Sequence, residues 1–126
     1  MFGVRCALLI SISFLLMPAA AARADDDVRR SGTCGAGVSS ELRVDPRDDG
    51  IRVRFTVEGR RAREKWRFVL VHERRVVWRG HRRTGSGGKV RIRRSVANFT
   101  GADFVSVRAS GPRGNTCSAS ATLPGS

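Results

Sequence analysis

The fold is decided by residues 51–58, which read Ile51-Arg52-Val53-Arg54-Phe55-Thr56-Val57-Glu58. Every second side chain in this stretch is apolar, and the side chains between them are polar or charged. Successive side chains of a β-strand point to opposite faces, so a period of two places one face in a core and the other in water. The stretch therefore predicts a half-buried β-strand.

Further short segments with strand character lie on both sides of this stretch. Residues 66–71 are apolar on both faces apart from Arg67, as expected of a central strand. The other predicted strands are residues 41–45, 76–78, 89–93, 105–109 and 117–123. Beyond residue 24 no segment has the i, i+3, i+4, i+7 spacing of an amphipathic helix. These patterns predict an all-β domain, most simply an antiparallel sandwich of about seven strands.

Turn residues separate the predicted strands. Residues 46–50 (PRDDG) and 111–114 (GPRG) are rich in the residues that turns favour. Glu73 and Arg74 form a tight connection between two strands. Residues 80–88 (GHRRTGSGG), which include His81, are expected to be a flexible loop because they contain four glycines.

Residues 1–24 have the organisation of a secretory signal peptide. Arg5 gives a positive start, an apolar run of 11 residues covers positions 7–17, and Ala22-Arg23-Ala24 offers an A-x-A cleavage site. A bilayer span needs about 20 apolar residues, so an uncleaved anchor is the weaker alternative. We expect cleavage after Ala24 and a secreted protein without a membrane span. The rest of the chain is then a flexible lead-in over residues 25–33 and a β-sandwich domain over residues 34–124.

Two cysteines, Cys34 and Cys117, remain after removal of the signal peptide. In an exported chain two cysteines most simply pair with each other, which predicts a disulfide that closes a long loop. Free thiols or a metal pair are the alternatives. The only histidines are His72 and His81, and neither a C-x-x-C nor an H-x-x-x-H spacing occurs, so no metal site and no cofactor are predicted.

The strand pattern resembles immunoglobulin-like sandwiches. Trp66 falls on the third predicted strand, where such domains often place a core tryptophan. The cysteines depart from the antibody pattern, because Cys34 precedes the first predicted strand and Cys117 lies on the last. The resemblance therefore implies an architecture, and it transfers no function.

The layout is also similar to small exported proteins of unknown role from high-GC Gram-positive bacteria. The strong excess of Arg over Lys agrees with a high-GC genome, since Lys65 and Lys89 are the only lysines. This resemblance implies export and a fold, and no activity. It rests on four short stretches, which are residues 29–34 (RRSGTC), 75–80 (RVVWRG), 97–103 (ANFTGAD) and 114–117 (GNTC).

The positive charge is the strongest indication of function. The chain has 24 Lys and Arg against 11 Asp and Glu, a formal charge of +13, which becomes +11 when Arg5 and Arg23 leave with the signal peptide. In an immunoglobulin-like sandwich the first, second and fifth strands share a sheet. The outward positions of that sheet form a candidate anion-binding face made of Arg43, Arg52, Arg54, Lys89, Arg91 and Arg93.

The sequence thus predicts a secreted, monomeric binding module and not an enzyme. It contains no G-x-S-x-G elbow and no paired acids at a diagnostic spacing, and the expected partners are anionic polymers such as teichoic acid, acidic polysaccharide or extracellular DNA. One alternative is a protease inhibitor that presents an arginine of the loop 59–63 (GRRAR). A second alternative is a structural domain whose basic surface has no specific ligand.

Overall fold

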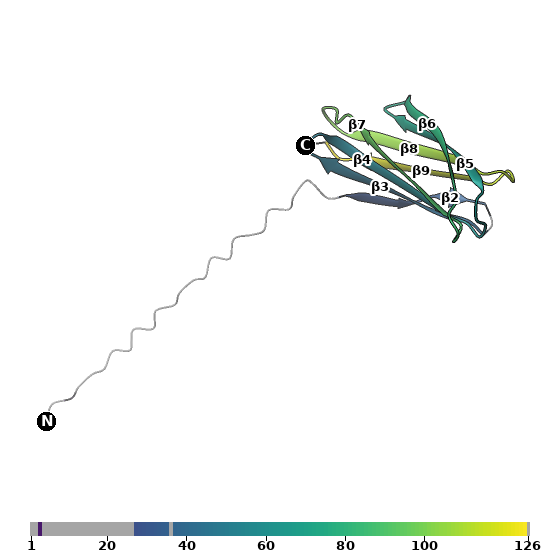
Figure 1. Cartoon of the computed structure of the whole chain (residues 1–126). Coiled ribbons are helices and arrows are strands. Elements are labelled where there is room, and N and C mark those ends of the chain that lie inside the picture. The colour runs from purple at the N-terminus through teal and green to yellow at the C-terminus, as the bar shows by residue number, and fades with distance from the viewer. Residues whose placement is uncertain (1–2, 4–26, 36, 126) are drawn as a thin grey trace.

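The protein is a two-layer all-β structure (Figure 1). The computed structural model describes residue 3 and residues 27–35 and 37–125, and within them there are strands and no helix. The predicted signal peptide, residues 1–24, lies outside the described residues apart from Gly3. The strands are β1 (Val28–Ser31), β2 (Thr33–Cys34), β3 (Ser39–Arg47), β4 (Gly50–Glu58), β5 (Lys65–His72), β6 (Arg75–Arg83), β7 (Lys89–Val96), β8 (Asp103–Ser110) and β9 (Thr116–Leu123).

The strands form two antiparallel sheets. One has the order β1-β3-β4-β7 and the other the order β2-β9-β8-β5-β6. The prediction of an all-β antiparallel sandwich is confirmed, and the seven predicted strands correspond to β3 through β9. No helix of the described residues is long and apolar enough to cross a membrane.

The core lies between the two sheets and follows from the alternation of β4. Ile51, Val53, Phe55 and Val57 are fully buried, whereas the residues between them are partly exposed. Phe55 meets Phe68 of β5 edge to face, with ring centroids 6.4 Å apart, so the central strands of the two sheets contact each other directly. Trp66, at the start of β5, is also buried.

The segment expected to be a flexible lead-in differs in the structure. Residues 28–31 form strand β1, which pairs with β3 in the register Arg29 opposite Arg43. Thr33 and Cys34 pair with β9, where Cys34 lies opposite Cys117. The predicted Cys34–Cys117 disulfide is confirmed, and it joins the edge strand β2 to β9. Strands β1 and β2 are too short to show a recognisable alternation of apolar residues, which explains why the sequence pattern did not predict them.

Strand β6 is longer than predicted and includes His81, which we had placed in a loop. Main-chain pairing continues through Gly80 opposite Phe68 and His81 opposite Arg67. A Cβ atom at position 80 would lie 2.3 Å from the Trp78 ring, so this position requires glycine for close packing. The glycine therefore serves the strand by accommodating an indole and does not mark a loop.

The β5–β6 hairpin has a strained two-residue turn. Glu73 and Arg74 have φ angles of 51° and 65°, the left-handed conformation that non-glycine residues adopt at a free-energy cost of about 1–2 kcal/mol each. Two consecutive positive φ angles match the twist of the flanking strands, which is why hairpins of this length favour Asn-Gly. The left-handed backbone conformation of residues 73 and 74 is thus imposed by the pairing of the flanking strands and not by the intrinsic conformational preference of Glu and Arg.

Arg74→Gly should therefore stabilise the domain by about 0.5–1 kcal/mol, since the removed strain exceeds the added freedom of the unfolded chain. The measurement is chemical denaturation of the purified protein. Arg75→Gly is the matched control, because Arg75 is an exposed strand residue whose replacement should destabilise by a similar amount. Equal stabilities of the two variants would contradict the assignment of strain to the turn.

Candidate anion-binding face

The outer face of the four-stranded sheet carries all six predicted anion-binding residues. Their neighbours in sequence, such as Val44, Val53 and Ile92, are buried between the sheets, so the alternating positions project outward. The strand register places Arg43 opposite Arg54 and Arg54 opposite Arg93. Arg29 of β1 lies opposite Arg43 and extends this line across all four strands. We call Arg29, Arg43, Arg54 and Arg93 the arginine row.

Asp45 offsets much of the charge of the arginine row. Its side chain is only 8% exposed although it projects outward, because arginine side chains cover it. Asp45 accepts a hydrogen bond from Arg54 at 3.2 Å, and its oxygens lie 3.5 Å from nitrogens of Arg43 and Arg47. Arg54 Nε is buried and has no hydrogen-bond partner among the described residues. Arg43 and Arg54 are therefore engaged within the protein.

Asp27 plays the same part at the edge of the sheet. Its Oδ2 atom accepts hydrogen bonds from Arg29, at 3.2 Å, and from Arg43. The hydrogen bond from Arg29, followed by the hydrogen bond and the positive charge of Arg43, lowers the pKa of Asp27 below its ordinary value of 3.8 despite partial desolvation. Asp27 consequently stays ionised in moderate acid and ties β1 to β3.

The cations on β4 and β7 are more available to a ligand. No ion pair joins Arg52 or Arg93 to a carboxylate of the part of the chain that the structure describes. Arg91 donates through Nε to Thr56 at 3.1 Å, which leaves its terminal nitrogens unused by that bond. Lys89 Nζ lies 3.4 Å from Glu58. We call Arg52, Lys89, Arg91 and Arg93 the available cations.

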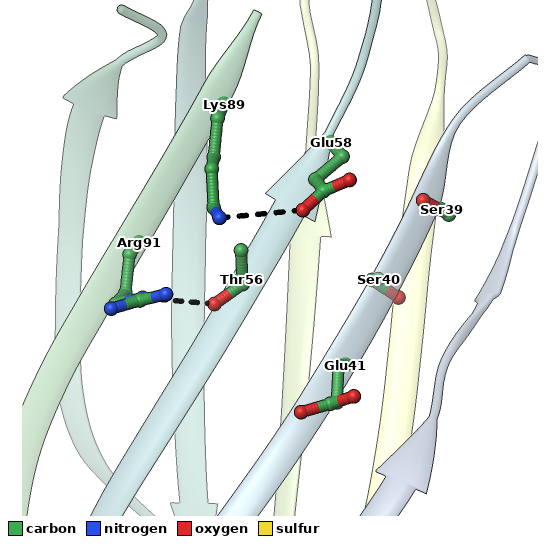
Figure 2. Close-up of a pocket in the computed structure, with 7 residues that line it drawn as sticks. All are labelled: Ser39, Ser40, Glu41, Thr56, Glu58, Lys89 and Arg91. Carbon is green, nitrogen blue, oxygen red and sulfur yellow. Dashed lines mark hydrogen bonds and ion pairs between the residues drawn. The ribbon is translucent and has the colours of Figure 1, made fainter.

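A shallow hollow lies at one end of this face (Figure 2). Figure 2 shows Lys89 and Arg91 of β7 reaching across to Glu58 and Thr56 of β4, with Glu41 of β3 beyond them. The hollow has a volume of about 360 Å³ and a polar lining. Two of its lining residues, Glu41 and Glu58, are acidic and two, Lys89 and Arg91, are basic, so the charges that line the hollow offset one another.

A second cluster of titratable residues lies at the end of the core and was missed from the sequence. His72 Nε2 is 2.8 Å from Asp103 Oδ1, and both side chains are at most 2% exposed. With Glu73 they place three potential ligand atoms within 4.8 Å of one another. Asp103 also accepts a hydrogen bond from the Phe99 main chain, and the Phe99 ring stacks on His72. This cluster fastens the loop before β8 to the end of β5.

The loop proposed for protease inhibition is held by hydrogen bonds to the β6–β7 connection. Thr84 Oγ1 donates to the carbonyl of Arg61 at 2.7 Å, and the Arg63 amide donates to the Thr84 carbonyl at 2.9 Å. Arg60 and Arg61 are exposed. The disulfide joins strands β2 and β9 and includes no residue of this loop.

Comparison with known proteins gives no assignment for this face or for the chain. No family model, no curated protein and no solved structure matches it. The function must therefore be argued from the residues themselves.

The pKa of Asp27 gives a test of the arrangement at β1. Because that pKa is lowered in the folded state, the ion pairs of Asp27 stabilise the fold above its unfolded pKa, and this contribution disappears as the pH falls through the folded pKa. An NMR titration of the Asp27 carboxyl should give a midpoint below 3.8, and Arg29→Gln should raise it. A midpoint at or above 3.8 in the unmodified protein would show that these pairs do not form.

Replacement of Asp45 tests whether it holds arginines of the face. Asp45→Asn should destabilise the domain by about 1–3 kcal/mol, because a covered carboxylate with three guanidinium neighbours is lost. The same variant should be retained more strongly on a polyanion column, since Arg54 and Arg47 lose their acidic partner, whereas Arg43 keeps its hydrogen bond to Asp27. Glu41→Gln is the matched control, because it removes the same charge from an exposed position, where the effect on stability stays within about 0.5 kcal/mol.

Proposed function

We propose that this protein is an exported, non-enzymatic module that binds anionic polymers through the available cations of β4 and β7. The observation that carries the proposal is the partition of charge on the face. Arg43 and Arg54 form ion pairs with Asp45, whereas Arg52 and Arg93 form none with a carboxylate of the described residues, although Asp45 lies opposite Arg52 in the strand register. Guanidinium groups without an internal partner are suited to bidentate contacts with phosphate, sulfate or carboxylate.

Export is supported by the disulfide and by the sequence of residues 1–24. A Cys34–Cys117 disulfide is consistent with an extracellular location, because intracellular reductants keep most thiols reduced. The apolar run followed by Ala22-Arg23-Ala24 supports cleavage of a signal peptide after Ala24. The released protein would start at Asp25 and retain every residue of the face.

An immunoglobulin-like relationship is supported by the strand order. Counted from β3, the first, second and fifth strands lie in one sheet, and the third, sixth and seventh lie in the other. Immunoglobulin-like sandwiches divide these six strands in the same way, whereas the fourth strand, β6, pairs here with the third and not with the sheet of the first. The disulfide within one sheet is a departure, so the relationship concerns architecture and does not supply a ligand.

Retention of the full exported chain on a polyanion resin tests the proposal. Replacing Arg52, Arg91 and Arg93 together with Ser should weaken binding by roughly tenfold at about 0.1 M ionic strength, and the unmodified protein should elute steeply with added salt. The matched control replaces three exposed arginines on the outer face of the other sheet, Arg67, Arg79 and Arg108. Equal losses in the two triple variants would refute a located site and leave only net charge.

A further inference from the structure

Three of the four cations of β7 form a regularly spaced line on one face of this edge strand, and the fourth, Arg94, lies on the other face. Lys89, Arg91 and Arg93 occupy every second position, and all three are exposed. In an extended strand two residues span about 6.6–6.8 Å, which corresponds to six backbone bonds. Arg52 prolongs the line, because it lies opposite Ser95 on the neighbouring strand.

A linear phosphodiester with three carbons between its phosphates has the same repeat. Successive phosphorus atoms in such a chain are also joined by six bonds, so an extended chain places one negative charge about every 6–7 Å, close to the spacing of the strand. A chain that runs parallel to β7 can thus present consecutive phosphates to consecutive cations. Because its charges have the same spacing as the cations of β7, such a chain differs from polyanions whose charges are spaced differently.

Two of the three cations have a polar partner on β4 before any ligand binds. Arg91 donates through Nε to the Thr56 hydroxyl, and Lys89 Nζ lies 3.4 Å from Glu58 in an exposed ion pair. The terminal nitrogens of Arg91 then remain for a bidentate phosphate contact. Restraint of long side chains matters here, because freely moving arginines would adapt to any spacing and lose the selectivity that the strand provides.

The side chains of the outer face also favour a polymer without nucleobases. The outward positions of β4 and β7 carry no aromatic side chain among the described residues, whereas proteins that bind single-stranded nucleic acids use aromatic rings on which bases stack. Trp78 belongs to the other sheet, and the guanidinium groups of Arg82 and Arg94 lie over its ring.

We infer that the line Lys89–Arg91–Arg93, continued by Arg52, recognises a base-free phosphodiester polymer with a three-carbon repeat, such as a poly(glycerol phosphate) chain. This inference rests on the proposed function, since it names the polymer that the available cations bind. The phosphates lie along β7, with Arg91 at the centre of the contact and the acids of the hollow beside Lys89 limiting the line at that end.

Synthetic phosphodiester oligomers with equal numbers of phosphates test the inference. Their linkers contain two, three or five carbons, so their repeats have five, six or eight bonds at constant charge. Fluorescence anisotropy with the full exported protein should show that the three-carbon oligomer binds roughly two- to fivefold more tightly than the others. The affinities of an abasic oligomer and of a single-stranded DNA of the same length are measured in the same way. Both have the six-bond repeat between phosphates, and only the DNA carries bases.

A charge-preserving variant locates the effect. Arg93→Ser combined with Ser95→Arg keeps the net charge and keeps all cations on the outer face, but it leaves a gap at position 93 in the line of cations. The variant should therefore lose the preference for the three-carbon oligomer. Thermal denaturation checks its folding, and Arg67→Ser on the opposite sheet should leave the preference unchanged. A preference that survives the Arg93–Ser95 exchange would place the site elsewhere and overturn the inference.

The outcomes separate this inference from the proposed function. Equal binding of all three linkers overturns the spacing argument while the polyanion proposal stands. Tighter binding of DNA than of its abasic form overturns the base-free assignment. Failure to bind any oligomer, together with loss of retention on the polyanion resin, overturns the proposed function itself.

Discussion

Burial of one face of β4 is the constraint on which the rest of the molecule depends. Because Phe55 and its alternate neighbours fill the space between the sheets, Arg52 and Arg54 have no position other than the outer face. A shift of the strand register by one residue would place arginines in the core, so the register is strongly specified. Because β3 and β7 pair with β4, Arg43 and Arg93 lie opposite Arg54 and project from the same outer face. The charged face is thus a consequence of the core.

The net charge of the protein is a poor measure of what this face offers to a ligand. Asp45 and Asp27 lie among the arginines of the row and bind them internally. Without those two acids, four guanidinium groups on neighbouring strands would repel one another across about 5 Å per strand. The two acids therefore reduce the repulsion within the arginine row. At the same time their ion pairs make Arg43 and Arg54 less available to a ligand. On β4 and β7, Arg52 and Arg93 form no ion pair with a carboxylate of the described residues, whereas Arg54 pairs with Asp45 and Lys89 with Glu58.

Local alternation could predict the core strands and the placement of the six cations, because parity is a property of adjacent residues. It could not predict contacts between distant residues. The His72–Asp103 hydrogen bond joins positions 31 residues apart, and β1 acquires its structure only by pairing with β3. The compensation of Arg54 by Asp45 depends on which residues of β3 and β4 are paired, and the alternation fixes only which face each residue takes. Gly80 is part of a strand and not of a loop, because its role is steric and is set by the indole of Trp78.

Edge protection is the competing explanation for arginines on β7, because charged side chains on an edge strand prevent pairing with a second sheet. Both edges can be compared within this molecule. Strand β6, the edge of the other sheet, carries Arg75, Arg79, Arg82 and Arg83, whose spacing is irregular and falls on both faces. On strand β7 three of the four cations, Lys89, Arg91 and Arg93, lie on the outer face, whereas Arg94 lies on the other face over the Trp78 ring. Edge protection requires charge but no particular spacing, whereas the proposed ligand uses the uninterrupted run of Lys89, Arg91 and Arg93, whose two-residue period follows from the exposed face of the strand.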